Sequence, residues 1–326
     1  MLEDPRRALS DPSAVILALD IGGTKVAAGV VDRDGRVVAQ RSMPTSARAD
    51  SEGLLAELVA LARAVLGAAD AGRSVGAIGV GCGGPMVFPE GVVSPLHIPA
   101  WRGFPLRARL EAEFSLPCSV DNDAKAMALG ESWRGAGRGS RHMLGMVVST
   151  GVGGGIVREG TLVDGAHGNA GHIGHVVVRP GGPDCECGAR GCAGTLASGS
   201  GIAARAREAA RGSEPTLLRD RLSAADVAVA ARAGDAVARR LFHDAGTALG
   251  LAIAAAQVLL DLDRVVVGGG VALGAWDLLA APLEYALRDA ARLSFARDLP
   301  VVRASLGARA GIVGAAALAL RPGAPP

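Results

Sequence analysis

Glycine clusters at the ends of short apolar runs constrain this chain more than any other feature of its sequence. Glycine accounts for 47 of the 326 residues, and it gathers at Gly22–Gly23, Gly81–Gly84, Gly151–Gly155 and Gly268–Gly270. The apolar runs before these clusters, such as Val15–Leu19, are typical of buried strands. Glycine lets a backbone turn sharply or approach a ligand closely. The sequence therefore predicts several tight turns at strand ends, where small anions can bind.

The pattern of strands and helices predicts an α/β protein of two domains. The predicted strands cover residues 15–19, 25–31, 37–40, 75–80, 119–121, 143–149, 156–158, 161–163 and 264–267, and the predicted helices cover 51–68, 123–131, 235–260 and a last helix from about 308. The order strand, glycine turn, hairpin and helix occurs in both halves, which predicts two similar domains that face one cleft. We expect a tail at 1–13, an N-terminal domain at 14–122 completed by the last helix at 308–321, and a C-terminal domain at 123–307.

Charge and hydropathy exclude several classes of protein. Hydrophobic residues make up 49% and charged residues 20% of the chain, and the formal net charge is +2. No dense Lys/Arg block is present, so binding to nucleic acid or to an anionic membrane by bulk charge is not expected. The first 13 residues lack the apolar core of a signal peptide, and the apolar stretch Ala245–Leu260 is short and followed by acids, as in a core helix. We expect a cytoplasmic protein without a membrane partner.

Three of the glycine turns carry groups that suit a nucleotide. In the first, Asp20 precedes Gly22, Gly23, Thr24 and Lys25, so a carboxylate that can hold Mg²⁺ through water lies beside a phosphate-binding turn. The other predicted phosphate or nucleotide residues are Thr150, Gly151, Gly153, Gly268, Gly269 and Gly270.

Each of these turns alone could be purely structural. The second could also belong to a dinucleotide fingerprint, but a hairpin pattern follows it where that motif needs a helix. The spacing of a P-loop does not occur in the sequence.

A cluster of one histidine and three cysteines predicts a zinc site. His175, Cys185, Cys187 and Cys192 lie close together in the sequence, with glycine and proline between them. An imidazole and thiolates at such separations can close a tetrahedron around Zn²⁺. Clustered cysteines in a cytoplasmic protein favour a metal over disulfides. The alternative, scattered buried thiols, fits Cys82 and Cys118 better than this knuckle at 175–192.

The motifs together resemble those of the ROK sugar kinases, which belong to the actin-like ATPase and hexokinase superfamily. Asp20–Lys25 and Thr150–Gly155 resemble the two phosphate loops of that family, and Val267–Val271 resembles its adenosine loop. The resemblance extends over about residues 14 to 316 of the chain. It implies two ribonuclease H-like domains around a central cleft, ATP with Mg²⁺ as donor, a structural Zn²⁺, a sugar as second substrate, and a homodimer.

The same resemblance assigns roles in the sugar site. Val120–Ala124 is similar to the family segment in which Asn122 would bind a sugar hydroxyl and Asp123 would be the general base. Asp123 could otherwise be a helix N-cap, a position that Asp favours. The turn that contains Gly83 and Gly84 resembles a sugar-facing loop of the family, and His175 would contact the sugar as well as zinc.

Two positions depart from the family pattern. His172 replaces a sugar-binding Glu of the family, and Gly194 replaces a second one. The implied function is phosphorylation of a hexose at its 6-hydroxyl, as in glucokinases, with His172 as a further sugar contact. The losses leave open an N-acetylmannosamine or other amino-sugar kinase, a polyphosphate donor, and a non-catalytic sugar-binding or regulatory protein. Regulators of the family carry a DNA-binding segment, which we do not expect ahead of Val15.

Overall fold

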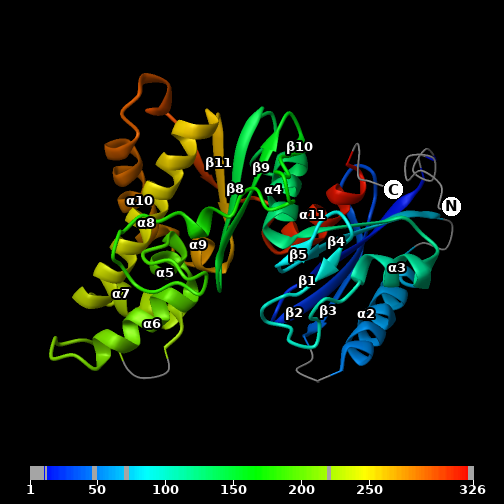
Figure 1. The fold of residues 1–326 in the computed structure, drawn as a ribbon, viewed down its shortest axis with the longest axis horizontal. Coiled ribbons are helices and arrows are strands. Elements are labelled where there is room, and N and C mark those ends of the chain that lie inside the picture. Colours follow the sequence, from blue (N-terminus) through cyan, green and yellow to red (C-terminus); the bar gives the residue numbers. More distant parts are fainter. Residues whose placement is uncertain (1–10, 12, 46–49, 70–72, 219–221, 322–326) are drawn as a thin grey trace. The chain divides into compact units, whose positions relative to one another are not determined.

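The computed structural model describes residues 11, 13–45, 50–69, 73–218 and 222–321. The chain forms two compact units (Figure 1): unit 1 comprises residues 1–139, 157–170 and 305–326, and unit 2 comprises 140–156 and 171–304. Residues 1–10 and 12 of the predicted tail lie outside the described residues.

Unit 1 is built on a five-stranded mixed sheet in the order β3-β2-β1-β4-β7. Its strands are β1 (Val15–Ile21), β2 (Lys25–Val31), β3 (Val37–Pro44), β4 (Val75–Cys82) and β7 (Cys118–Asn122). The first three strands form an antiparallel meander, whereas β4 and β7 run parallel to β1. The strands predicted from the apolar runs are confirmed, β2 with the predicted bounds and the others with ends moved by a few residues. A short hairpin, β5 (Met86–Val87) and β6 (Val92–Val93), follows β4.

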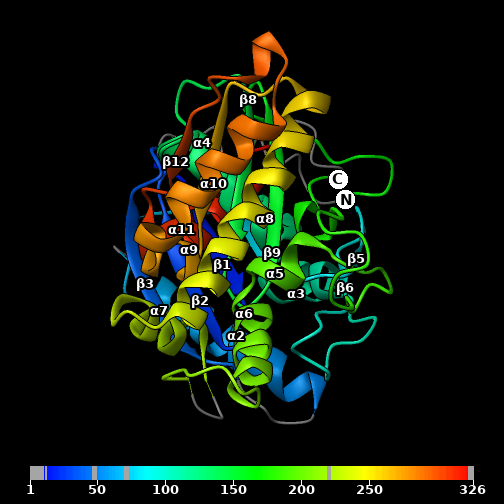
Figure 2. The same cartoon turned by 90° about the vertical axis from the view of Figure 1, so that its left-hand side faces the viewer.

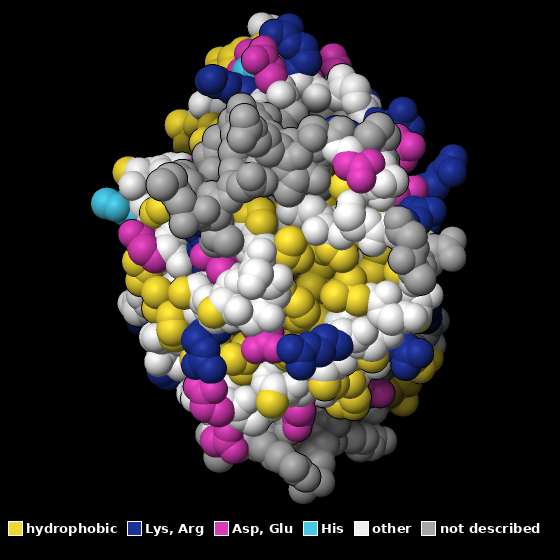
Figure 3. Space-filling view, turned by 90° about the vertical axis from the view of Figure 1, so that its right-hand side faces the viewer, with side chains coloured by type: hydrophobic (Ala, Val, Ile, Leu, Met, Phe, Trp, Pro, Cys, Tyr) yellow, Lys and Arg dark blue, Asp and Glu magenta, His cyan; other side chains and the backbone are white. Residues whose placement is uncertain are grey.

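Helices cover both faces of this sheet. They are α2 (Ser51–Leu66), α3 (Leu106–Phe114), α4 (Asp123–Arg134) and α11 (Ala310–Ala319), the last preceded by a 3₁₀ turn, η3 (Gly307–Arg309). Alternate residues of β1 point to opposite faces, so Leu17 and Leu19 pack with α2 and α3 whereas Ile16 packs with Ile312 of α11. On the face in Figure 3, Lys and Arg side chains alternate with Asp and Glu, in keeping with the small net charge.

The sequence placed a domain boundary at residue 122, before α4, but α4 groups with unit 1. The reason is that α4 packs along α11, where Gly130 lies against Gly314. The segment 157–170 also groups with unit 1. Helix packing between distant segments determines this grouping, and the order of motifs along the chain does not reveal it.

A second five-stranded sheet has the order β10-β9-β8-β11-β12. Its strands are β8 (His142–Val148), β9 (Val152–Arg158), β10 (Thr161–Leu162), β11 (Arg264–Gly268) and β12 (Val301–Arg303). The β9–β10 hairpin about Gly160 is confirmed, and β11 runs parallel to β8 and β12. An antiparallel part followed by parallel strands is the arrangement of the first sheet as well, so the predicted repeat is present.

The helices of unit 2 include one that is long and apolar. They are α5 (Ala193–Ala197), α6 (Gly199–Ala210), α7 (Ala224–Arg232), α8 (Ala236–Leu260), α9 (Gly270–Gly274) and α10 (Trp276–Ala290), with 3₁₀ turns η1 (Ile173–His175) and η2 (Ser294–Ala296). The predicted helix at 235–260 is confirmed, and the Asp235 carboxylate caps it by accepting a hydrogen bond from the Ala238 amide. By length and composition α8 could cross a membrane, but most of its apolar residues belong to the core of unit 2.

Helices α8 and α10 lie side by side (Figure 2), and glycine in α8 permits their close approach. A Cβ on Gly250 would lie 2.3 Å from the Leu283 carbonyl oxygen of α10. Because that atom belongs to the backbone, one helix would have to move to make room.

We therefore expect Gly250→Ala to destabilise the protein by about 1–3 kcal/mol, the usual range for overpacking, despite the better helix propensity of alanine. Urea unfolding measures the change. Gly274→Ala is the matched control, because no heavy atom lies within 4 Å of its Cβ position. Equal stability of the two variants would contradict this account of the α8–α10 contact.

Candidate active site

The parallel strands of unit 1 bring the predicted catalytic groups to one edge of the sheet. In the strand register Asp20 of β1 lies opposite Gly81 of β4, and Gly81 lies opposite Asp121 of β7. One step further, Cys82 lies opposite Asn122. The carboxyl ends of parallel strands are the usual place for ligands in α/β sheets. Asp20, the Gly81–Gly84 turn and the Asn122–Asp123 pair therefore belong to one site.

The start of α4 determines how Asn122 and Asp123 are oriented. Asn122 is the N-cap, and its Oδ1 accepts a hydrogen bond of 3.0 Å from the Ala124 amide. Asp123 is the first helical residue, and its Oδ1 accepts from the same amide at 2.8 Å. The cap is thus supplied by Asn122, and the alternative in which Asp123 serves as the N-cap does not hold. The amide nitrogen of Asn122 and the second oxygen of Asp123 are not used by this cap.

Burial makes both carboxylates of the edge weaker acids. It raises the pKa of Asp123, against the lowering effects of the Ala124 amide and of His97. It also raises the pKa of Asp20 to about 6, and the negative charge of Asp123 adds to this effect while Lys25 opposes it. Two buried acids with raised pKa values, one of them raised further by the charge of the other, mark a functional site or a cation site.

The first glycine turn is closed by backbone hydrogen bonds and held by a residue that the sequence analysis missed. The Gly22 amide donates to the Lys25 carbonyl at 3.0 Å, and the Thr45 hydroxyl donates to the Gly22 carbonyl at 2.7 Å. The side chains of Thr24 and Lys25 are exposed. Thr45 follows β3, and it is so far from the turn in the sequence that its hydrogen bond to the turn could not be predicted.

Two further residues that the sequence did not assign lie against the site. A Cβ on Gly23 would lie 2.4 Å from the Cβ of His97, so His97 packs directly on the phosphate turn. A Cβ on Gly311, near the start of α11, would lie 2.1 Å from the Asp20 Oδ2. The N-terminal end of α11 thus approaches Asp20 to a distance that only glycine allows.

The second and third glycine turns lie side by side in unit 2. The turn after β8 is shorter than predicted: the Ser149 amide donates to the Gly151 carbonyl, and β9 begins at Val152. Gly153 therefore lies in a strand, because glycines can pair in a sheet when a neighbouring strand offers partners. Gly268 ends β11, which pairs with β8, and Gly269 and Gly270 lead into α9.

The start of α6 fixes the second turn. The Gly199 amide donates to the Ser149 carbonyl at 2.7 Å, and the Ser200 hydroxyl donates to the Thr150 carbonyl at 2.8 Å. Neither contact was predicted, because α6 lies about fifty residues further along the chain.

The four predicted zinc ligands gather in unit 2. One ligand atom from each of His175, Cys185, Cys187 and Cys192 lies within 4.8 Å of the others. The Cys185 Sγ lies 3.6 Å from the His175 Nδ1, and the Cys187 and Cys192 sulfurs are 3.7 Å apart. Tetrahedral zinc with Zn–S bonds of about 2.3 Å needs sulfurs about 3.8 Å apart, so the residues fit this metal.

The predicted sugar contacts fall into two groups, one in each unit. In unit 1, a Cβ on Gly84 would lie 3.5 Å from the Asn122 Nδ2, and Gly83 adjoins it. In unit 2, the exposed His172 ring stacks near the His175 ring, with centroids 6.2 Å apart. Gly194 lies in α5, which follows the last of the clustered cysteines.

Comparison with known proteins shows the family of the chain. The model of the ROK family matches residues 16–322, so the chain belongs to the ROK family. It is 37% identical to the glucokinase of Halalkalibacterium halodurans, over 91% of this chain and 92% of that protein. It is 36% identical to the N-acetylmannosamine kinase of Escherichia fergusonii, over 93% of this chain and 97% of that protein.

Solved structures give the same fold. The ROK hexokinase from Thermus thermophilus superposes with a TM-score of 0.83 at 37% identity, covering 94% of this chain and 98% of that one. The ROK glucokinase from Streptomyces griseus, solved with glucose and AMPPNP, superposes with a TM-score of 0.78 at 32% identity, covering 94% of this chain and 99% of that one. The predicted actin-like α/β fold is confirmed.

The raised pKa of Asp20 predicts a stability effect. Its folded pKa of about 6 exceeds the ordinary aspartate value of 3.8, so the folded state binds the proton more tightly and loses stability as pH rises from 4 through 6. Without Mg²⁺, Asp20→Asn should therefore be more stable than the parent at pH 8 by about 2–3 kcal/mol, and equally stable near pH 4. Urea unfolding across this pH range tests it, and a difference that does not change with pH would contradict it.

Proposed function

We propose that this chain is an ATP-dependent sugar kinase that transfers the γ-phosphoryl group of ATP to the 6-hydroxyl of a hexose, with Asp123 as the general base. The observation that carries the proposal is the Asn122–Asp123 pair at the start of α4. This pair directly follows Asp121, which lies in the same row of the sheet as Asp20, with β4 between their strands. Membership of the ROK family and the similarity to glucokinases support it.

Asp123 and Asn122 have different roles toward the sugar. The second carboxylate oxygen of Asp123 accepts the proton of the attacking hydroxyl, and the raised pKa makes this carboxylate a stronger base. The amide nitrogen of Asn122 donates to a neighbouring sugar hydroxyl and orients the ring. Such positioning and charge neutralisation supply most of the catalysis in phosphoryl transfer, because its transition state is loose.

The glycine turns hold the nucleotide. Backbone amides of Gly22 and Gly23, together with Thr24 and Lys25, bind phosphate oxygens in unit 1. In unit 2, the proposed phosphate and adenosine contacts come from Thr150, Gly151, Gly153 and Gly268–Gly270. Asp20 would hold Mg²⁺, which would neutralise charge on the phosphates when bound.

Zinc stabilises the loop that carries His175. The Nδ1 of His175 faces the Cys185 sulfur, so this nitrogen would hold the metal and Nε2 would be available to a sugar hydroxyl. The ligands span a segment in which η1 and short bridges are the regular structure among the described residues, so metal ligation supplies order that burial does not.

The identity of the sugar depends on His172 and Gly194. A glutamate carboxylate can accept hydrogen bonds from two hydroxyls, whereas the neutral imidazole of His172 has one acceptor nitrogen and one donor nitrogen, and Gly194 offers no side chain. Similarity to glucokinases and to N-acetylmannosamine kinases is nearly equal, so an amino-sugar kinase is the second candidate. The homodimer remains a prediction from the family resemblance.

Removal of the base tests the proposed chemistry. Asp123→Asn preserves size and the hydrogen bond at the helix start but cannot take a proton. We expect kcat to fall by about 10²–10⁴-fold, with the sugar Kd changed by less than about 5-fold. ADP release measures kcat, and calorimetry measures binding, with glucose, mannose, fructose and their N-acetyl derivatives as acceptors.

Asp289→Asn is a control, since this exposed acid pairs with Arg292 at the far end of α10 and belongs to none of the proposed binding turns. Full activity in Asp123→Asn would exclude this residue as the base. Silence of the parent protein with every sugar in the panel would instead favour a non-catalytic binding protein.

Removal of a thiol tests the metal site. Cys187→Ser should lose about one zinc per chain, measured by atomic emission, and should lower the Tm, because a metal site that orders a loop contributes to folding. Cys118→Ala is the control. Cys118 is buried in the core of unit 1, so this variant should bind as much zinc as the parent protein. The site would be ruled out if the parent protein, kept reduced, binds no zinc and its Tm does not rise when zinc is added.

A further inference from the structure

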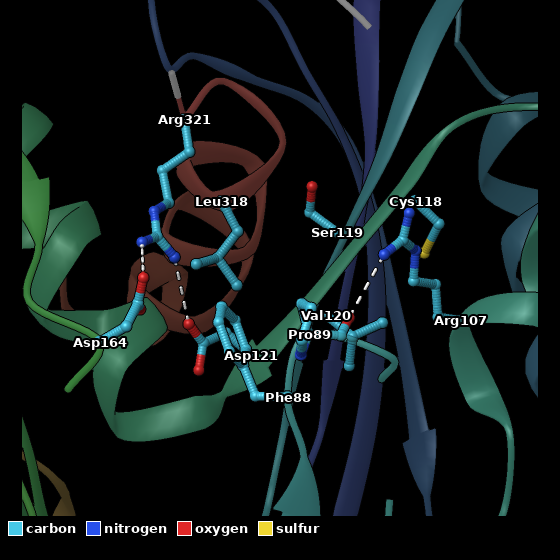
Figure 4. Close-up of a pocket in the computed structure, with 10 residues that line it drawn as sticks. All are labelled: Phe88, Pro89, Arg107, Cys118, Ser119, Val120, Asp121, Asp164, Leu318 and Arg321. Atoms are coloured by element: carbon cyan, nitrogen blue, oxygen red, sulfur yellow. Dashed lines mark hydrogen bonds and ion pairs between the residues drawn. The ribbon is translucent and has the colours of Figure 1, made fainter. Parts of the chain in front are cut away.

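Four charged side chains of unit 1 form a closed ring of alternating charge behind the Asn122–Asp123 turn. The Lys125 Nζ lies 2.8 Å from the Asp121 carboxylate and 3.0 Å from the Asp164 carboxylate. Arg321 closes the ring by pairing with both acids, to Asp121 at 3.4 Å. Figure 4 shows Arg321 reaching from the end of α11 toward Asp164 and Asp121. The ring carries no net charge and joins β7, α4, the segment after β10 and the chain after α11.

The inner half of the ring is deeply buried. Lys125 is 1% exposed and Asp121 is 2% exposed. The Lys125 Nζ also donates to the Gly168 carbonyl at 3.1 Å and lies 5.2 Å from the centre of the Phe88 ring. A lysine in the first turn of a helix is unfavourable to the helix dipole, and its burial is costly unless it is paired. Solubility therefore does not explain why a charged lysine is buried in this position.

The ring touches the catalytic turn on both sides. Asp121, just before the turn, accepts a hydrogen bond of 2.7 Å from the Asn122 amide through one oxygen and binds Lys125 through the other. Lys125 lies two residues after Asp123, on the first turn of α4. The Lys125–Asp121 pair therefore spans the residues that carry the proposed chemistry and fixes the distance between the end of β7 and the start of α4.

Packing alone does not hold this side of the turn. A cavity of about 280 Å³ lies beside the ring, lined by Phe88, Val120, Asp121, Asp164, Leu318 and Arg321 among others (Figure 4). The end of β7 borders this space on one side, so the packing around Asp121 is incomplete there. The ion pairs provide the restraint that is missing.

We propose that Lys125, Asp121, Asp164 and Arg321 are positioning residues, which hold Asn122 and Asp123 in the orientation that phosphoryl transfer needs. The inference rests on the proposed kinase function for its effect on rate, but its structural part can be measured without activity. None of the four residues contacts the reacting atoms, and each acts through the turn.

The test compares Lys125→Met, which keeps the length but removes the charge, with Lys125→Arg, which keeps the charge. We expect Lys125→Met to lower kcat by about 10–100-fold, as a displacement of about 1 Å does in other sites, with the KM for ATP changed by less than about 3-fold. Lys125→Arg should recover most of the loss. Arg205→Met is the matched control, because it breaks a partly buried pair with Asp244 in unit 2 and should lower the Tm while keeping kcat.

Hydrogen exchange of the Ala124 amide gives the readout that does not need activity. This amide binds both Asn122 and Asp123, so it should lose protection in Lys125→Met and keep it in Arg205→Met. If the parent protein has no kinase activity, the proposed function fails while this exchange still decides the role of the ring. If Lys125→Met does not fold, Asp164→Asn weakens the ring from its more exposed side and should give a smaller change of the same kind. Parent kcat and parent exchange in a folded variant would overturn the proposal.

Discussion

The parallel pairing of β1, β4 and β7 is the constraint on which the rest of the site depends. It places Asp20, Gly81 and Asp121 in one row across the sheet, and the chain turns into α4 directly beyond that row. A slip of one residue in either pairing would turn the side chains to the opposite face and separate the acids. The buried apolar residues of β1, which pack against helices on both faces, oppose such a slip.

That arrangement buries three carboxylates near the ends of these strands, and their environments differ in two ways. At the site, Asp20 and Asp123 are left with raised pKa values, which destabilises the ionised apo protein and prepares the edge for a cation and a proton. Behind the site, Asp121 also has a pKa raised by burial, but Lys125 and Arg321 lower it. Among the described residues, no Lys or Arg forms an ion pair with Asp20 or Asp123, whereas Asp121 is paired with Lys125 and Arg321.

The two sheets share one arrangement, a strand that ends at a glycine turn, but different segments hold the two turns. Each ends a strand at a glycine turn whose backbone is held by a distant segment: Thr45 for the turn in unit 1 and the start of α6 for the turn in unit 2. The loop of clustered thiols lies between β10 and β11 of the second sheet. That loop is rich in glycine and proline and cannot bury a core of its own, so a metal is the natural way to order it.

The sequence by itself determined the strands, the glycine turns, the thiol cluster and the Asn122–Asp123 pair, because these depend on local composition and short spacing. It placed the end of the second turn too late, since glycines at 153–155 pair in β9 where a sheet neighbour is available. Only the tertiary structure decided that α4 joins unit 1, that His97, Thr45 and Gly311 border the site, and that Lys125 meets Arg321 through two acids. Those contacts join segments far apart in the chain, and their partners are chosen by packing and by the need to neutralise buried charge, which no local pattern records.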